Sequence, residues 1–102
     1  MRLNNFSEIL QEENDMNGLF IKYLRVTTIH GTTHPVGVIV AESPTNIGWS
    51  LCAVNDQFSY KRARTIAMGR LKKHPKRLPP MEMIQFITDT LPDIVRWYES
   101  RA

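Results

Sequence analysis

The stretch IGWSLCAVNDQFSYKRARTIAMGRLKK, residues 47–73, decides the fold class because its hydrophobic periodicity changes halfway along. From Ile47 to Ala53 apolar residues alternate with small or polar ones, which predicts a strand with Trp49 as its aromatic core anchor. Residues 55–57 break this pattern. Ser59 is then a favourable N-cap for a basic helix over residues 59–73. A strand followed directly by an amphipathic helix indicates an α+β protein.

The predicted helix has two unlike faces. At 100° per residue its apolar side chains fall in one arc, which should face the core. These residues are Tyr60, Ala63, Ile66, Ala67 and Leu71. Five cations fall on the opposite arc: Lys61, Arg62, Arg64, Lys72 and Lys73. Arg70 lies inside the apolar arc, so we expect it to pair with the Asp56 carboxylate. The alternative is that Arg70 extends outward and joins the basic surface.

Two further strands are predicted upstream. Leu19 to Ile29 is rich in β-branched and aromatic residues on both faces, which is typical of a central strand. Residues 31–33 form a tight connection, and valines alternate from Val36 to Val40 in a second strand. Residues 42–46 have the composition of a loop. Residues 18–54 are therefore predicted to form a three-stranded antiparallel meander.

The flanking segments complete a single domain over residues 1–102. Residues 1–17 are predicted to be a short acidic helix or arm, and residues 74–80 a basic, proline-containing linker. Residues 81–100 have helical periodicity, which we expect Pro92 to divide into two short helices. The predicted architecture has this N-terminal helix and two to three C-terminal helices packed on one face of the sheet.

The charge distribution is strongly asymmetric. Residues 57–81 contain no Asp or Glu and eight of the 13 Lys and Arg residues. The rest of the chain has five basic residues against all 10 acidic ones, so it is net −5 beside a segment of +8. A stretch of one sign this dense predicts a polyanionic partner.

We therefore expect a small non-enzymatic protein that binds nucleic acid through this segment. The predicted binding residues are Lys61, Arg62, Arg64, Lys72, Lys73, Lys76 and Arg77. The alternative is an inhibitor or adaptor that docks the same basic face on an acidic protein surface. Trp49, Phe58 and Tyr60 could stack on nucleotide bases, although aromatic residues at these spacings are more often part of a core.

Other function classes have little support. No catalytic constellation is present, so we expect no enzyme and no cofactor. His30, His34 and Cys52 do not have the spacing of a recognised zinc site, and we predict no metal. The single cysteine, the absence of a signal-peptide pattern and the lack of a long apolar run predict a cytoplasmic protein without a membrane span.

Three short motifs resemble those of a group of proteins. They are residues 48–52 (GWSLC), the Asp56-x-Phe58 turn, and residues 64–70 (RTIAMGR). This series resembles a pattern in small uncharacterised phage and prophage proteins, although Ala63 stands where many of those have glycine. The resemblance implies an origin in a mobile element, and the function would then be that of a phage regulatory or accessory factor.

Overall fold

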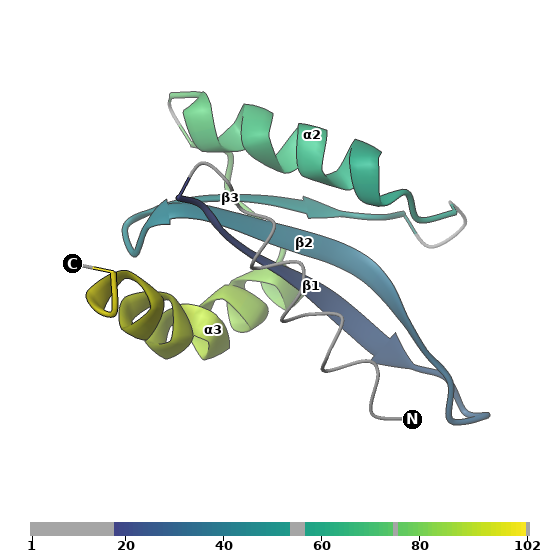
Figure 1. Cartoon of the computed structure of the whole chain (residues 1–102). Helices are drawn as coiled ribbons and strands as arrows, with labels where there is room; N and C mark the ends of the chain where they lie inside the picture. Colours follow the sequence, from purple (N-terminus) through teal and green to yellow (C-terminus); the bar gives the residue numbers. More distant parts are fainter. Residues whose placement is uncertain (1–17, 54–56, 75, 102) are drawn as a thin grey trace.

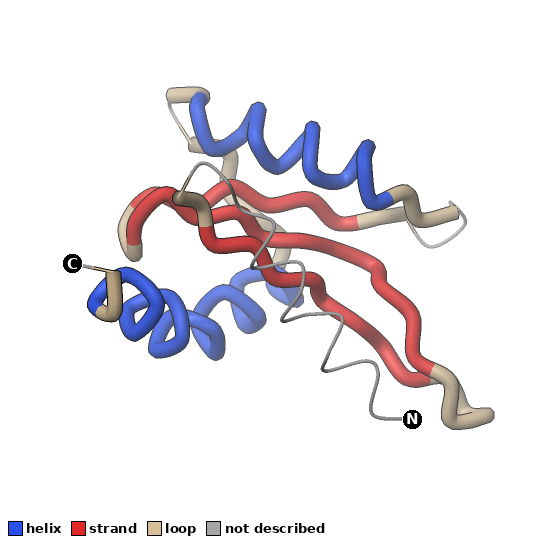
Figure 2. The backbone as a smooth tube through the Cα atoms, in the orientation of Figure 1, coloured by secondary structure: helices blue, strands red, loops and turns tan. Residues whose placement is uncertain are grey.

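Residues 18–53, 57–74 and 76–101 are described by a computed structural model of the chain. A three-stranded antiparallel sheet carries one helix on each face (Figure 1; Figure 2). The strands are β1 (Phe20–Thr27), β2 (Thr33–Ser43) and β3 (Asn46–Leu51). The helices are α2 (Tyr60–Lys72) and α3 (Met81–Glu99). The predicted α+β class and the three-stranded meander are confirmed.

The strand order is β1-β2-β3, so β2 is the central strand. The prediction that the first strand is central is therefore wrong. Both faces of β1 are apolar because helices cover both faces of the sheet. They are not apolar because strands flank β1 on both sides. A tight turn that contains Gly31 (φ +85°) joins β1 to β2. Past a register shift at Leu24 and Arg25, this hairpin extends beyond the end of β3 (Figure 1).

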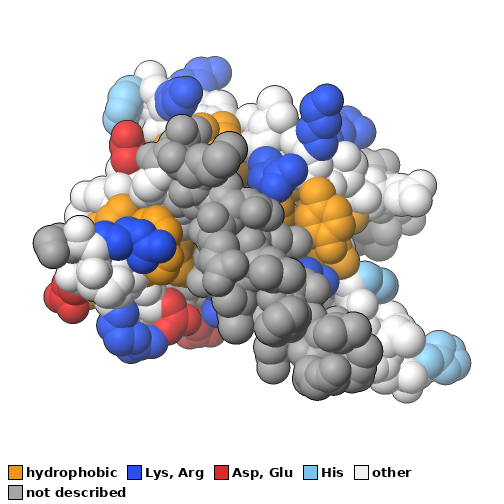
Figure 3. Space-filling view, in the orientation of Figure 1, with side chains coloured by type: hydrophobic (Ala, Val, Ile, Leu, Met, Phe, Trp, Pro, Cys, Tyr) orange, Lys and Arg blue, Asp and Glu red, His pale blue; other side chains and the backbone are white. Residues whose placement is uncertain are grey.

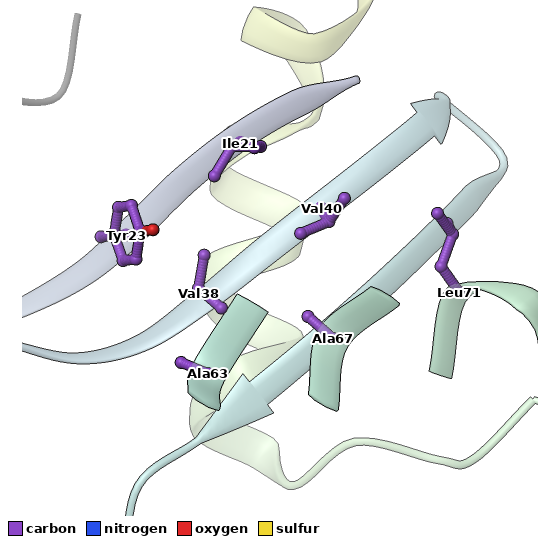
Figure 4. Close-up of a cluster of buried hydrophobic side chains, with 7 residues drawn as sticks. All are labelled: Ile21, Tyr23, Val38, Val40, Ala63, Ala67 and Leu71. Atoms are coloured by element: carbon purple, nitrogen blue, oxygen red, sulfur yellow. The ribbon is translucent and has the colours of Figure 1, made fainter. Parts of the chain in front are cut away.

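The face of the sheet under α2 is formed by alternate residues of β1 and β2. Figure 4 shows these side chains meeting one side of the helix. The buried cluster is Ile21, Tyr23, Val38, Val40, Ala63, Ala67 and Leu71. Gly48 of β3 allows the helix to approach closely, since an added Cβ would lie 2.1 Å from the Ala67 carbonyl oxygen. The small residues of α2 and β3 thus bring the basic helix directly onto the sheet.

The intervening strand residues point to the opposite face, where α3 lies. The buried cluster there is Phe20, Ile39, Ala41, Trp49, Met83 and Ile94. The C-terminal part of α3 is held by the Tyr98 hydroxyl, which is 2.6 Å from the Ala41 carbonyl oxygen and 2.9 Å from that of Gly18. Alternation along the strands therefore produces two cores, one on each side of the sheet.

Two predictions about the helices need correction. The two described helices lie on opposite faces of the sheet. Both faces are apolar, so helices packed on one face alone would leave the other apolar face exposed to water. Residues 81–99 form one helix with Pro92 inside it, and not two short helices. Pro92 is exposed, so water can solvate the carbonyl group that loses its hydrogen bond. The predicted N-terminal helix lies outside the described residues.

Neither described helix combines the length and the hydrophobicity needed to cross a membrane.

Candidate polyanion-binding surface

Helix α2 positions the predicted binding residues by burying its other side. Ser59 caps the helix, and its hydroxyl accepts a hydrogen bond from the Arg62 backbone N–H at 3.2 Å. Because Ala63, Ala67 and Leu71 are buried against the sheet, the cations on the far side point into solvent. Four exposed residues form what we call the basic face: Lys61, Arg62, Lys72 and Lys73.

The basic face is not neutralised by neighbouring carboxylates within the described residues. Their two ion pairs both involve Asp93 of α3, which contacts Lys22 (3.5 Å) and Arg96. Figure 3 shows blue side chains standing over α2 and a mixture of blue and red ones over α3. Cations that lack nearby counter-charges keep their field available for an anionic partner.

Two of the predicted binding residues are placed differently. Arg64 is half-buried on the β1 side of α2, close to Tyr23. Burial raises the pKa of the Tyr23 hydroxyl, and the positive charge of Arg64 partly offsets that rise. The Lys76 ammonium group donates hydrogen bonds to the carbonyl oxygens of Leu71 and Arg70, the latter at 3.4 Å. It therefore caps the C-terminal end of α2.

Arg70 has a structural partner that the sequence did not reveal. Its guanidinium Cζ lies 4.0 Å from the ring centroid of Trp49, and its Nη1 donates to the Trp49 carbonyl oxygen at 3.1 Å. Burial, and to a lesser extent the charge of Arg77, lowers the pKa of Arg70 below its ordinary value. The predicted pairing with Asp56 falls outside the described residues.

The same tryptophan positions the linker after α2. Its indole Nε1 donates to the Arg77 carbonyl oxygen at 3.3 Å, which holds the linker beside β3. Exposed Arg77 and half-buried Arg70 both line a cavity of about 1410 Å³ at this edge of the sheet. Trp49 thus links β3, α2 and the linker at a single point.

This cavity, which we call the edge groove, is largely apolar. The β1–β2 hairpin and β3 contribute Leu24, Val26, Pro35 and Leu51, and Phe58 and Tyr60 line it as well. Leu78 of the linker also lines it and is 83% exposed. A smaller cavity of about 180 Å³ shares Leu51 and Phe58 with the groove and is bordered by Arg62. Sequence reasoning missed the groove because its lining comes from segments far apart in the chain.

The side chains considered for a metal site do not gather in one place. His30 is exposed at the tip of the β1–β2 hairpin, and His34 follows on β2. Within the described ranges, no group of three or more His, Cys, Asp or Glu side chains could hold a metal ion.

Comparisons with protein-family models, curated proteins and solved structures found no match to this chain.

Proposed function

We propose that this protein is a non-enzymatic nucleic-acid-binding protein that contacts phosphates through the basic face of α2 and through Arg77. One observation supports this most directly: these cations are exposed, and none of them joins an ion pair between described residues. Each cation that meets a phosphate releases a condensed counterion, which drives binding. In keeping with the phage resemblance, the role would be that of a regulatory or accessory factor.

The test replaces all four residues of the basic face with Gln. Gln has a helix propensity close to that of Lys and Arg, and the buried side of α2 is untouched, so the variant should fold normally. Binding to nucleic acid should fall by at least about tenfold. Circular dichroism melting and fluorescence anisotropy with a labelled oligonucleotide measure the two properties on one sample.

A matched pair of variants controls for total charge. Lys72→Gln with Lys73→Gln removes two exposed cations at the end of α2. Arg96→Gln with Arg101→Gln removes two exposed cations at the end of α3. The proposal requires the first pair to weaken binding much more than the second. Equal effects would mean that net charge alone attracts the oligonucleotide.

A second candidate function is docking on an acidic protein surface. It is favoured by two exposed apolar side chains that follow the cations, Leu78 (83% exposed) and Met81 (73% exposed). Phosphates do not need such neighbours, whereas a protein partner would bury them. Binding to polyglutamate with no binding to nucleic acid would select this function over the first.

A further inference from the structure

Three arginines border the edge groove and the small cavity that adjoins it. Arg62 and Arg70 come from one flank of α2, eight positions apart, and Arg77 comes from the linker. Arg62 borders the small cavity beside Ser50 and Leu51 of β3, and Arg70 donates to the Trp49 carbonyl oxygen, so both residues lie on the β3 side of α2. Guanidinium groups match phosphate oxygens with two parallel hydrogen bonds. A row of anionic groups running along β3 would therefore meet all three.

The groove that Arg70 and Arg77 line also contains an aromatic residue that its neighbours hold in place. The Tyr60 ring, 38% exposed, lines the groove at the start of α2. It makes edge-to-face contacts with Tyr23 (5.0 Å between ring centroids) and Phe58 (5.2 Å). These contacts hold the ring in place while leaving part of it accessible. Leu78 and Val26 (40% exposed) add aliphatic surface to the same groove.

We propose that the edge groove binds single-stranded nucleic acid, with phosphates on Arg62, Arg70 and Arg77 and unstacked bases against Tyr60 and Leu78. This inference rests on the proposed function and names its substrate class. A duplex buries the faces of its bases in its own stack, so it offers nothing to an apolar groove. A single strand offers a base face and a phosphate at every nucleotide.

The experiment measures the affinity of the full chain for two labelled probes. One is an oligothymidylate of about 20 nucleotides, which exceeds the ~4–16-nucleotide sites of single-strand-binding domains. The other is a mixed-sequence duplex of equal length. We expect the single strand to bind at least about tenfold more tightly, because only it gains base stacking. Trp49 fluorescence should also change on binding, since its indole is next to Arg70.

Two pairs of variants locate the bases. Tyr60→Leu should weaken binding of the single strand about 5- to 100-fold and leave duplex binding unchanged, whereas Tyr60→Phe should keep most of the affinity. Leu78→Ser should also weaken single-strand binding. Ile29→Ser is its control, because Ile29 is 96% exposed at the hairpin tip and does not line the groove. Melting curves check that each variant is folded.

The outcomes separate this inference from the proposed function. Equal affinity for both probes, with no effect of Tyr60→Leu, overturns single-strand binding and leaves binding through the basic face intact. Binding of neither probe, with binding of polyglutamate, overturns both. A single-strand preference that folded Tyr60→Leu and Leu78→Ser retain in full also overturns the assignment of the bases to this groove.

Discussion

Arg70 forms a bridge between α2 and the edge of the sheet. Its guanidinium covers the Trp49 ring and donates to the Trp49 carbonyl oxygen, while the Trp49 indole donates to the linker. The carbonyl group of an edge strand is thereby satisfied by a side chain and is not left open to pairing with another chain. One arginine thus contributes packing, a charge-assisted hydrogen bond and protection of an edge.

We predict that Arg70→Ala lowers the free energy of unfolding by about 1–3 kcal/mol, through loss of the stacked contact and of the hydrogen bond. Lys72→Ala, two residues further along at an exposed position, should change it by less than about 0.5 kcal/mol. Urea unfolding followed by tryptophan fluorescence measures both values. Equal stabilities would show that the contact with Trp49 contributes nothing to the fold.

Sequence reasoning identified Arg70 as unusual and did not find its partner. A cation within an apolar arc is visible from periodicity alone, and the structure confirms that Arg70 is half-buried. The contact with Trp49 spans 21 positions and depends on how α2 crosses β3, which no local pattern encodes. The same limit explains Arg64 and Lys76, whose positive charge is evident from the sequence but whose neighbours are not.

The packing of helix α2 on strand β3 depends on Gly48. An added Cβ would lie 2.1 Å from the Ala67 carbonyl oxygen and 2.7 Å from the Leu71 nitrogen, and both are backbone atoms that cannot turn aside. We predict that Gly48→Ala destabilises the protein by about 3 kcal/mol or more, because the helix must move off the sheet. That corresponds to a fall in the melting temperature of at least ~12 °C for a domain of this size.

Gly69 provides the control for this substitution. It lies in the same helix with no atom within 4 Å of an added Cβ. Gly69→Ala should therefore stabilise the protein by up to about 1 kcal/mol, through helix propensity alone. Differential scanning calorimetry of the two variants tests the sign of each effect. A melting temperature that rises for both would mean that α2 is not seated on β3 as described.

Whole elements were more predictable than their arrangement. Alternation and helical periodicity are local, so residues 47–53 and 59–73 gave a strand and a helix close to β3 and α2. The face on which each helix packs is a non-local property. Helices cover both faces of the sheet because β1 has apolar residues on both of its sides. The same pattern is typical of a central strand, so it did not show on which face each helix packs. Pro92 misled because its cost of about 3 kcal/mol inside a helix is outweighed by the burial of Met83 and Ile94 on either side of it.

Across the described residues of the molecule, charge is separated between the two helical layers. The cations of α2 and the linker lie on one side of the sheet and at its β3 edge, whereas four of the five described acidic residues belong to α3. Sequence composition alone located this asymmetry. It could not show the edge groove, because the groove exists only where the hairpin extends past β3 beside the linker.

We predict that binding to a single strand depends on salt in proportion to the phosphates contacted. The basic face, Arg70 and Arg77 together neutralise about six phosphates, so log K should fall against log salt with a slope of about −4. Replacing the basic face with Gln leaves the contacts of Arg70 and Arg77 and should reduce the slope to about −1.4. Anisotropy titrations at several salt concentrations provide both slopes. If the Gln variant bound more weakly with an unchanged slope, the lost affinity would have come from a disturbed surface and not from phosphate contacts.

Tyr60→Leu is the complementary variant, because it removes base stacking and leaves every cation in place. Its affinity should fall while its slope stays at the value for the unmodified protein.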